Sequence, residues 1–485
     1  MTQEYEQPKL SFQGKETRSC GVLSASFFAA FTAYLAIQNL QSSINQQAGL
    51  GTISLSVQYA CIIFSGVCAP AVIRWIGVKN TLIISWICHA IYTGSNFYPA
   101  FFTLIPSSAL LGTISGFLWT SQSIYITMCS FSIVSYTKQS TYNVLSKLNG
   151  LFFTIYETTQ IPGNLVSSLV LQTGTHQNAT EEAVCGPDFC PSASNGTDVA
   201  IPSMDKVYTM LGIYLAFDII SVAITVFFLP PLPKSSWSEN TTLTGSLSSL
   251  FVTLFTSKMI FLVPFIMYQA VEQAVLWGDY TLSYISCPVG VHMVGFVMAA
   301  YGTATAISAL VFSRVAKYTG RILLFSAAAV SQGGLFIVLY LWTPTPADTK
   351  YIFMLPVLWG MGEGIWQTQA NSLIALLFPD NKEPAFANFV TWKAIGFTIT
   401  FVLSEFVCLR AKLIFVLSLL TIGMVLYTGV EIYWKVHDKS HTVTGDINSG
   451  LSSKAVSEEN IPILTDAQPP ASNYGNVDKS CPKTD

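Results

Sequence analysis

Acidic and amide side chains recur at helical spacing inside otherwise apolar stretches of this chain, and they are its best candidates for chemistry. Glu157, Gln160 and Asn164 stand at i, i+3 and i+7, which places them on one face of a helix. The full set that we expect to line a polar cavity is Tyr34, Gln38, Gln41, Asn45, Glu157, Gln160, Asn164, Glu272, Glu363, Gln367 and Lys393. Such faces predict either a hydrated cavity or hydrogen bonds that join helices.

The two kinds of side chain favour different interpretations. Hydrogen bonds between membrane helices contribute only about 0.6 kcal/mol on average, and for the amides this joining role is slightly favoured. Carboxylates are costly inside a membrane, so Glu157 and Glu363 favour a functional role. Lys393 is the only cation at a similar predicted depth, so some of these carboxyl groups are expected to hold a proton. That would suit a proton-coupled carrier and would equally suit an inert buried acid.

No pattern in the sequence predicts an enzyme, a metal site or a cofactor. The ten cysteines form no C-x-x-C pair, and the five histidines are scattered. A nucleophile elbow and a Walker loop are both absent from the sequence. Gly360-x-Gly362-x-Gly364 lies inside an apolar run, so it indicates close helix packing rather than a phosphate loop. His89 and Asp218 fall on helices expected at the periphery, which favours a structural role for both.

The composition is that of a protein that crosses the membrane many times. Hydrophobic residues make up 51% of the chain and charged residues 10%, and the net charge of −3 argues for no nucleic-acid partner. We expect twelve spans, which makes the fold class an all-α membrane protein. They cover residues 20–42, 53–75, 80–98, 103–128, 148–172, 206–229, 259–282, 293–315, 322–342, 351–377, 388–408 and 413–434.

The polar run 173–203 fixes the expected orientation of these spans. It carries two N-glycosylation acceptors, Asn178 and Asn195, and two cysteines, Cys185 and Cys190, which belong to an oxidising, non-cytosolic compartment. We favour a local disulfide between these cysteines, with Cys287 as the competing partner. Five spans precede the run, so both termini are expected in the cytosol. Cytosolic segments then hold 19 lysines and arginines against 4 outside, as the positive-inside rule requires.

The spans are expected to form two similar halves of six helices. Span two is followed by Arg74-Trp-Ile-Gly77, and span eight by Lys317-Tyr-Thr-Gly320 and Arg321, which we interpret as matching cytosolic hinge loops. Parallel repeats of this kind are the plan of major facilitator transporters. The expected segments are a cytosolic N-terminus (1–19), a first bundle (20–229) with its extracellular loop (173–203), a cytosolic linker (230–258), a second bundle (259–434) and a disordered cytosolic tail (435–485).

Several blocks of residues in one order resemble the Unc-ninety-three family over about residues 35–430. The blocks are Gln41-Ser-Ser-Ile-Asn45, Gly49-Leu-Gly-Thr-Ile-Ser54, Asn96-Phe-Tyr-Pro99, Trp366-Gln-Thr-Gln369 and Glu383-Pro-Ala-Phe-Ala-Asn388. This resemblance implies a major-facilitator-like fold. It also implies a role as a regulatory subunit of a potassium channel or as a trafficking partner of other membrane proteins, with the plasma membrane as the expected location.

Both hinge loops depart from working transporters. The typical loop after span two carries an acid before its basic residue, but here Ile73 precedes Arg74 and Ala316 precedes Lys317. The missing acids argue against transporter-style gating and favour the potassium channel regulator. The alternatives are a secondary transporter, suggested by Glu157 and Glu363, and a trafficking chaperone for membrane receptors, suggested by short sorting-like patterns in the tail.

Overall fold

The computed structural model describes residues 13–137, 139, 141–172, 185–191, 202–232, 248, 251–378 and 382–455. Every regular element in these ranges is a helix. The first half contains α1 (Glu16–Ile44), η1 (Gln47–Gly49), α2 (Leu50–Ile76), α3 (Val78–Ser95), α4 (Phe101–Tyr136), α5 (Thr141–Glu157), α6 (Gln160–Gln172), η2 (Gly186–Asp188) and α7 (Met204–Phe228). The second half contains α9 (Ser257–Ala274), η5 (Val275–Ser286), α10 (Cys287–Val289), α11 (His292–Thr319), α12 (Arg321–Leu341), η6 (Pro346–Asp348), α13 (Thr349–Leu377), α14 (Lys382–Leu403) and α15 (Leu409–Ala455).

Each predicted span coincides with one of these helices or with a short succession of them. Within the described residues, nine helices are long and apolar enough to cross a membrane. Large apolar side chains face outward at many points, among them Phe64, Phe227 and Val330. Because a soluble protein rarely exposes so much apolar surface, these faces belong against lipid. The chain is therefore an all-helical membrane protein, and the count of twelve spans stays a prediction.

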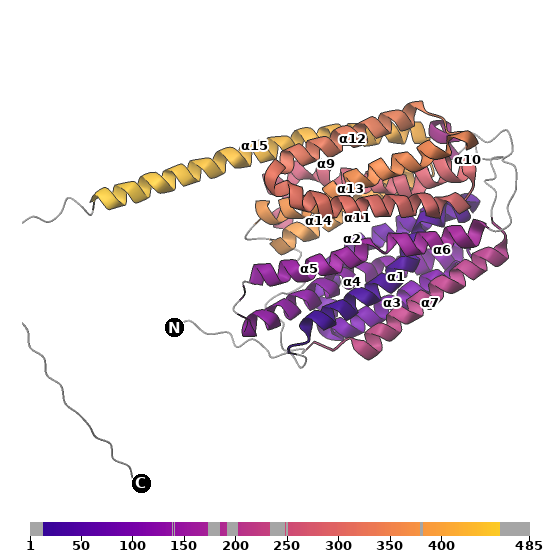
Figure 1. Cartoon of the computed structure of the whole chain (residues 1–485), viewed down its shortest axis with the longest axis horizontal. Coiled ribbons are helices and arrows are strands. Elements are labelled where there is room, and N and C mark those ends of the chain that lie inside the picture. The colour runs from indigo at the N-terminus through magenta and orange to yellow at the C-terminus, as the bar shows by residue number, and fades with distance from the viewer. Residues whose placement is uncertain are drawn as a thin grey trace, which may run out of the picture. The chain divides into compact units, whose positions relative to one another are not determined.

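The helices up to Val430 form one compact unit. Figure 1 shows α1 to α7 as one group of helices and α9 to α14 as another beside it. The two groups pack against each other through α2 on α14, α6 on α11 and α1 on η5. The contact of α6 with α11 is close, since a Cβ atom added at Gly295 would lie 2.0 Å from the carbonyl oxygen of Asn164.

Two glycine turns occupy corresponding places in the two halves. Gly77 joins α2 to α3 with φ +91°, and Gly320 joins α11 to α12 with φ +78°. In each turn the glycine N–H donates to the carbonyl of the residue four places earlier, Ile73 at 2.7 Å and Ala316 at 2.9 Å. Only glycine adopts such a positive φ without steric cost. The hinge role of these loops and the repeat of the two halves stay predictions.

Span five, predicted as one helix, is broken into α5 and α6 at Thr158 and Thr159. Pro162 explains the break, because its ring clashes with the carbonyl of the residue four places earlier, Thr158. The break leaves Glu157 as the last residue of α5. The interruption therefore separates Glu157 from Gln160 and Asn164, which the sequence places on one continuous helix face.

The last helix is longer than its predicted span. α15 continues to Ala455, so residues 435–455, which the sequence predicts as part of a disordered tail, are helical. Once the apolar span has formed a helix, each added residue needs no new nucleation, which favours continuation into a polar segment. Residues 456–485, the rest of the predicted tail, lie outside the described residues.

For orientation we define the disulfide end as the end of the helices where Cys287 and Cys408 lie. The connections from α1 to α2, from α6 to α7 and from α14 to α15 belong to this end. The glycine turns at Gly77 and Gly320 lie at the opposite end.

Candidate functional site

The centre of the candidate site is a pair of buried carboxyl groups in the second half. Glu272 on α9 and Glu363 on α13 are 0% and 1% exposed, and their carboxyl groups lie close enough to interact with each other. Two carboxylates buried side by side repel each other, which favours a proton on one of them. We call these two residues the carboxyl pair.

Glycines on α13 explain how Glu363 is positioned. Added Cβ atoms at Gly360 and Gly364 would clash with α11, and one at Gly362 would meet the Gln332 side chain of α12. These three positions therefore let α13 approach both helices closely, as the sequence predicts for Gly360-x-Gly362-x-Gly364. With those faces occupied, Glu363 on a different face of α13 meets α9.

Neutral donors satisfy one oxygen of each carboxyl group. Trp359 donates its indole N–H to Glu272 Oε2, and Gln273 donates its amide N–H to Glu363 Oε1. The other two oxygens, Glu272 Oε1 and Glu363 Oε2, are buried and have no conventional donor among the described residues. These two oxygens are therefore available to accept from a proton or another positively charged group.

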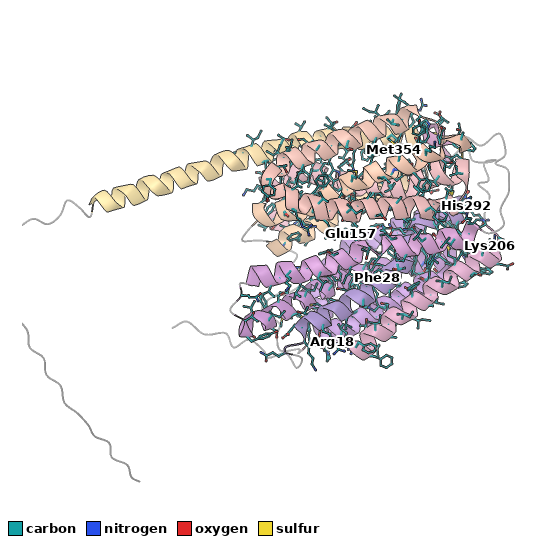
Figure 2. All side chains as sticks on the ribbon, viewed as in Figure 1. Arg18, Phe28, Glu157, Lys206, His292 and Met354 are labelled. Atoms are coloured by element: carbon teal, nitrogen blue, oxygen red, sulfur yellow. A yellow bond between two sulfur atoms is a disulfide. The ribbon has the colours of Figure 1, made fainter. Side chains whose placement is uncertain are left out.

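Three more predicted residues join the carboxyl pair. Gln367 lies one turn further along α13, close to Glu363, and Glu157 and Lys393 both interact with Glu363 electrostatically. Unlike the pair, these three side chains are partly exposed. Figure 2 shows Glu157 at the end of α5, where the two groups of helices face each other. The predicted set of Glu157, Glu272, Glu363, Gln367 and Lys393 therefore comes together from both halves.

The amides of the first half form a separate network that joins helices within that half. Gln41 donates to Tyr92 Oη at 2.8 Å and to Asn96 Oδ1 at 2.9 Å, both in the α3 region. Asn45 donates to Asn96 Oδ1 at 3.1 Å. These contacts join α1 to α3 and its C-terminal residue. They match the joining role that the sequence slightly favours for amides, and none of these hydrogen bonds involves the carboxyl pair.

The other amides of the first half behave similarly. Asn39 on α1 donates to Gln160 Oε1 at 3.3 Å and to Asn164 Oδ1 at 3.0 Å, which joins α1 to α6. Two further hydrogen bonds join α1 to α2. Gln38 on α1 donates to Tyr59 Oη on α2 at 3.2 Å, and Tyr34 on α1 accepts a hydrogen bond from Gln58 on α2. Tyr59 in turn stacks on Phe397 of α14 with ring centroids 4.3 Å apart, which carries the network to the second half.

His89 and Asp218 are buried between helices of the first half. The His89 ring lies among the rings of Phe31, Tyr34 and Trp86. Asp218 on α7 accepts a hydrogen bond of 2.6 Å from Thr93 on α3. Both positions agree with the structural role predicted for them.

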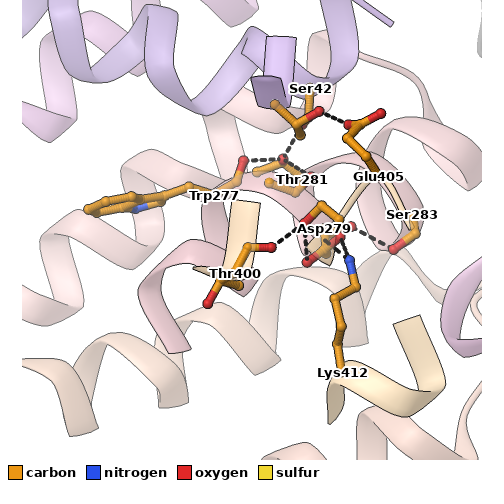
Figure 3. A network of polar contacts seen from close by, with 11 residues as sticks. Ser42, Trp277, Asp279, Thr281, Ser283, Thr400, Glu405 and Lys412 are labelled. Atoms are coloured by element: carbon orange, nitrogen blue, oxygen red, sulfur yellow. Dashed lines mark hydrogen bonds and ion pairs between the residues drawn. The ribbon is translucent and has the colours of Figure 1, made fainter. Parts of the chain in front are cut away.

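The sequence did not predict a buried ion pair near the disulfide end. Lys412 directs its ammonium group at Asp279, and the two side chains are 3% and 8% exposed. Figure 3 shows this pair with Ser283 and Thr400 beside it. Asp279 lies in the π-helical stretch η5, a kind of helix that is rare and often occurs at functional sites. The signal available in the sequence was a pair of opposite charges at similar depth, but Lys412 was placed in an outside loop.

The two halves are held together close to this ion pair. Ser42 Oγ is 3.2 Å from Thr281 Oγ1, and Ser43 Oγ is 2.8 Å from Ser286 Oγ, which joins α1 to η5. Glu405 accepts a hydrogen bond from Thr52 on α2. These contacts between halves lie at the disulfide end, as does the packing of α6 on α11.

The predicted disulfide between Cys185 and Cys190 is wrong. Cys185 is bonded to Cys287, the competing partner, and Cys190 is bonded to Cys408. The residues between the two cysteines are held against the second half, which draws each cysteine to a partner there. Asp188 forms an ion pair of 3.0 Å with Arg410, and the carbonyl of Phe189 accepts a backbone hydrogen bond from Leu409. The predicted glycosylation acceptors Asn178 and Asn195 lie outside the described residues.

The described residues contain no group of three or more histidine, cysteine, aspartate or glutamate side chains that could hold a metal ion.

Solved structures define the class of protein to which this fold belongs. The chain superimposes on a crystal structure of the nucleoside transporter NupG with a TM-score of 0.60 at 13% identity, covering 86% of this chain and 99% of that one. It superimposes on a POT family transporter in complex with 5-aminolevulinic acid with a TM-score of 0.62 at 12% identity, covering 86% and 96%. The fold is therefore that of a major-facilitator-type membrane protein.

The family is narrower than the fold. The profile described as "Ion channel regulatory protein UNC-93" matches residues 41–428, and the chain belongs to this UNC-93 family. It is 37% identical to protein unc-93 homolog A of Xenopus laevis, covering 90% of this chain and 98% of the relative, and 34% identical to that of Homo sapiens, covering 86% and 93%. A Caenorhabditis elegans relative named as a potassium channel regulatory protein is 31% identical, covering 84% of this chain and 60% of that one.

Proposed function

We propose that this protein regulates a potassium channel in the plasma membrane. The observation that carries the proposal is membership of the UNC-93 family together with 31% identity to a relative whose name states that role. The hinge turns support it, because Ile73 and Ala316 stand where transporters carry an acid before the basic residue. The outward apolar faces offer surface on which a second membrane protein can pack without exposing polar backbone.

The test is a recording of potassium current in cells that express a two-pore potassium channel with or without this protein. Channel abundance at the cell surface is measured in the same cells. A change in current per surface channel supports regulation. A change in surface abundance alone points instead to a trafficking chaperone, and no change in either quantity across several such channels overturns both roles.

A second candidate function is secondary transport, favoured by the carboxyl pair inside a major-facilitator-type fold. Intramembrane carboxyl groups near the contact of two halves are typical of proton relays in carriers. If the protein is a carrier, Glu363→Gln abolishes uptake into proteoliposomes, whereas channel current per surface channel is unchanged by co-expression.

A further inference from the structure

The charges around the carboxyl pair do not balance. Glu157, Glu272 and Glu363 interact with one another or with the same neighbours, and Lys393 is the cation that interacts with all three. Among the described residues, the other titratable groups that interact with them are the neutral hydroxyl groups of Tyr156 on α5, Tyr268 on α9 and Tyr301 on α11. Without a proton, three carboxylates stand against one ammonium group. The cluster then has an excess of negative charge, which favours one bound positive charge, either a proton or another cation.

Acceptor atoms without donors also favour a bound positive charge. Glu272 Oε1 and Glu363 Oε2 are buried without a conventional donor among the described residues, and so is the side-chain oxygen of Gln269. Gln269 and Glu272 stand at i and i+3, on one face of α9. A buried acceptor without a donor costs free energy, and a cation placed between such oxygens removes that cost. The arrangement rejects anions, since its unfilled atoms are acceptors.

A polar row on α13 connects the pair to the end opposite the disulfides. Glu363, Gln367 and Asn371 stand at i, i+4 and i+8, so they share one face of the helix. Glu363 is buried, Gln367 is partly exposed and Asn371 is exposed. Exposure therefore increases step by step away from the pair, which gives a small ion a polar path to the site from that end.

We propose that Glu272 and Glu363 form an exchange site for a single positive charge, held by a proton at rest and by a small monovalent cation when the proton leaves. The ligand class is an alkali ion or a primary ammonium ion. One proton leaves the pair for the aqueous phase as one cation enters, so the exchange leaves the charge of the site unchanged. A divalent ion is not the ligand, because the described carboxyl groups do not assemble a metal cage. This inference does not rest on channel regulation; it deepens the second candidate, transport, by naming the substrate class.

The test uses the full chain in lipid nanodiscs near neutral pH. Potassium, sodium or methylammonium chloride is added against N-methylglucamine chloride, and proton release is followed with an indicator dye in weak buffer. Difference infrared spectra report the carbonyl band of a protonated carboxyl group. For the wild-type protein we expect one of these cations to release a proton and to remove that band. The cation that does so identifies the ligand as an alkali ion or an ammonium ion.

Variants identify the carboxyl groups that carry the exchange. Glu272→Gln and Glu363→Gln should each lose the cation-dependent proton release. Asp218→Asn is the matched control, because Asp218 is equally buried, has one oxygen without a conventional donor and lies on α7 outside the cluster. It should release the proton as the wild type does. A folded wild-type protein that releases no proton with any of the cations overturns the inference, and so does undiminished release by both glutamine variants.

Uptake into proteoliposomes separates this inference from the transport candidate. Cation-dependent proton release without uptake leaves the exchange site in place and rejects transport. Uptake of a neutral or anionic solute without proton release from the pair rejects the exchange site and retains transport.

Discussion

At the scale of single residues, the structure contains two buried charge clusters that are balanced in different ways. Asp279 and Lys412 neutralise each other directly, with Ser404 donating to Asp279 at 3.3 Å. The carboxyl pair has neutral donors instead, and two of its oxygens have no conventional donor among the described residues. A fully paired cluster is suited to a structural role, whereas a cluster with unfilled acceptors is suited to exchange.

Removal of Lys412 tests the structural role of the ion pair. Lys412→Met leaves Asp279 buried without its cation, and we expect the free energy of unfolding to fall by about 3–5 kcal/mol. The measurement is a denaturant titration in mixed micelles. The matched control is Arg410→Ala, which breaks the Asp188–Arg410 pair, whose side chains are 53% and 46% exposed. An exposed pair contributes at most about 1 kcal/mol, so equal effects of the two variants would contradict the burial of the Asp279–Lys412 pair.

Sequence reasoning found the carboxylates of the site but not the partners of each charge. Glu157, Glu272 and Glu363 were identifiable because an acid within an apolar run is conspicuous at any position. The pairing of Asp279 with Lys412 spans 133 residues and depends on how η5 packs against the start of α15. That packing is a tertiary contact, and helical periodicity carries no information about it.

At the scale of elements, the helices and the sharp turns between them follow from local sequence. The apolar runs predict the helices, and Gly77 and Gly320 predict the two turns. The break between α5 and α6 could also have been predicted, since Pro162 stands inside the predicted span. The residues around Pro162 form a continuous apolar run, which favoured the prediction of one unbroken helix. The disulfide pairing could not be predicted from the sequence, because the spacing of the cysteines does not indicate which surface the segment 185–191 contacts.

Substitution of the two turn glycines tests the repeat of the halves. Gly77→Ala and Gly320→Ala place a Cβ atom on a residue with positive φ, and we expect each to lower the free energy of unfolding by about 1–2 kcal/mol. Added Cβ atoms at both positions meet nothing within 4 Å, so the cost comes from the backbone alone. Gly150→Ala is the control, since Gly150 lies in α5 with open space around it and without a positive φ. That change should be neutral or stabilising, and a similar loss at all three positions would reject this explanation.

The disulfide pairing can be tested by counting the cysteines that remain as thiols. The two disulfides of the described residues leave six of the ten cysteines for a polyethylene glycol maleimide under denaturing, non-reducing conditions, with Cys481, which lies outside the described residues, counted as a thiol. A single local bond between Cys185 and Cys190 would leave eight. In the Cys287→Ser variant we expect the thiol of Cys185 to become reactive while the Cys190–Cys408 bond remains. Peptide mapping identifies the modified residue, and an unreactive Cys185 in this variant would contradict the observed pairing.

At the scale of the whole molecule, the two ends of the helices differ in what holds the halves together. The disulfide end has both disulfides, the Asp188–Arg410 pair and the contacts of α1 with η5. Figure 1 shows α5 and α14 at the other end as ribbons of separate groups. Disulfides form in oxidising compartments, so we expect the disulfide end to face the outside or a secretory lumen.

Glycosylation tests this orientation, because glycans are added in the same compartment in which disulfides form. In the sequence, the acceptors Asn178 and Asn195 follow α6, which ends at the disulfide end, whereas a third acceptor, Asn240 in Asn240-Thr-Thr, follows α7, which ends at the opposite end. We therefore expect Asn178→Gln and Asn195→Gln each to remove one endoglycosidase-sensitive shift on a denaturing gel, and Asn240→Gln to change nothing. A glycan on Asn240 with none on the other two would show that the protein has the opposite orientation in the membrane. It would also place the polar row of Glu363, Gln367 and Asn371, and with it the access path to the carboxyl pair, on the outside of the cell.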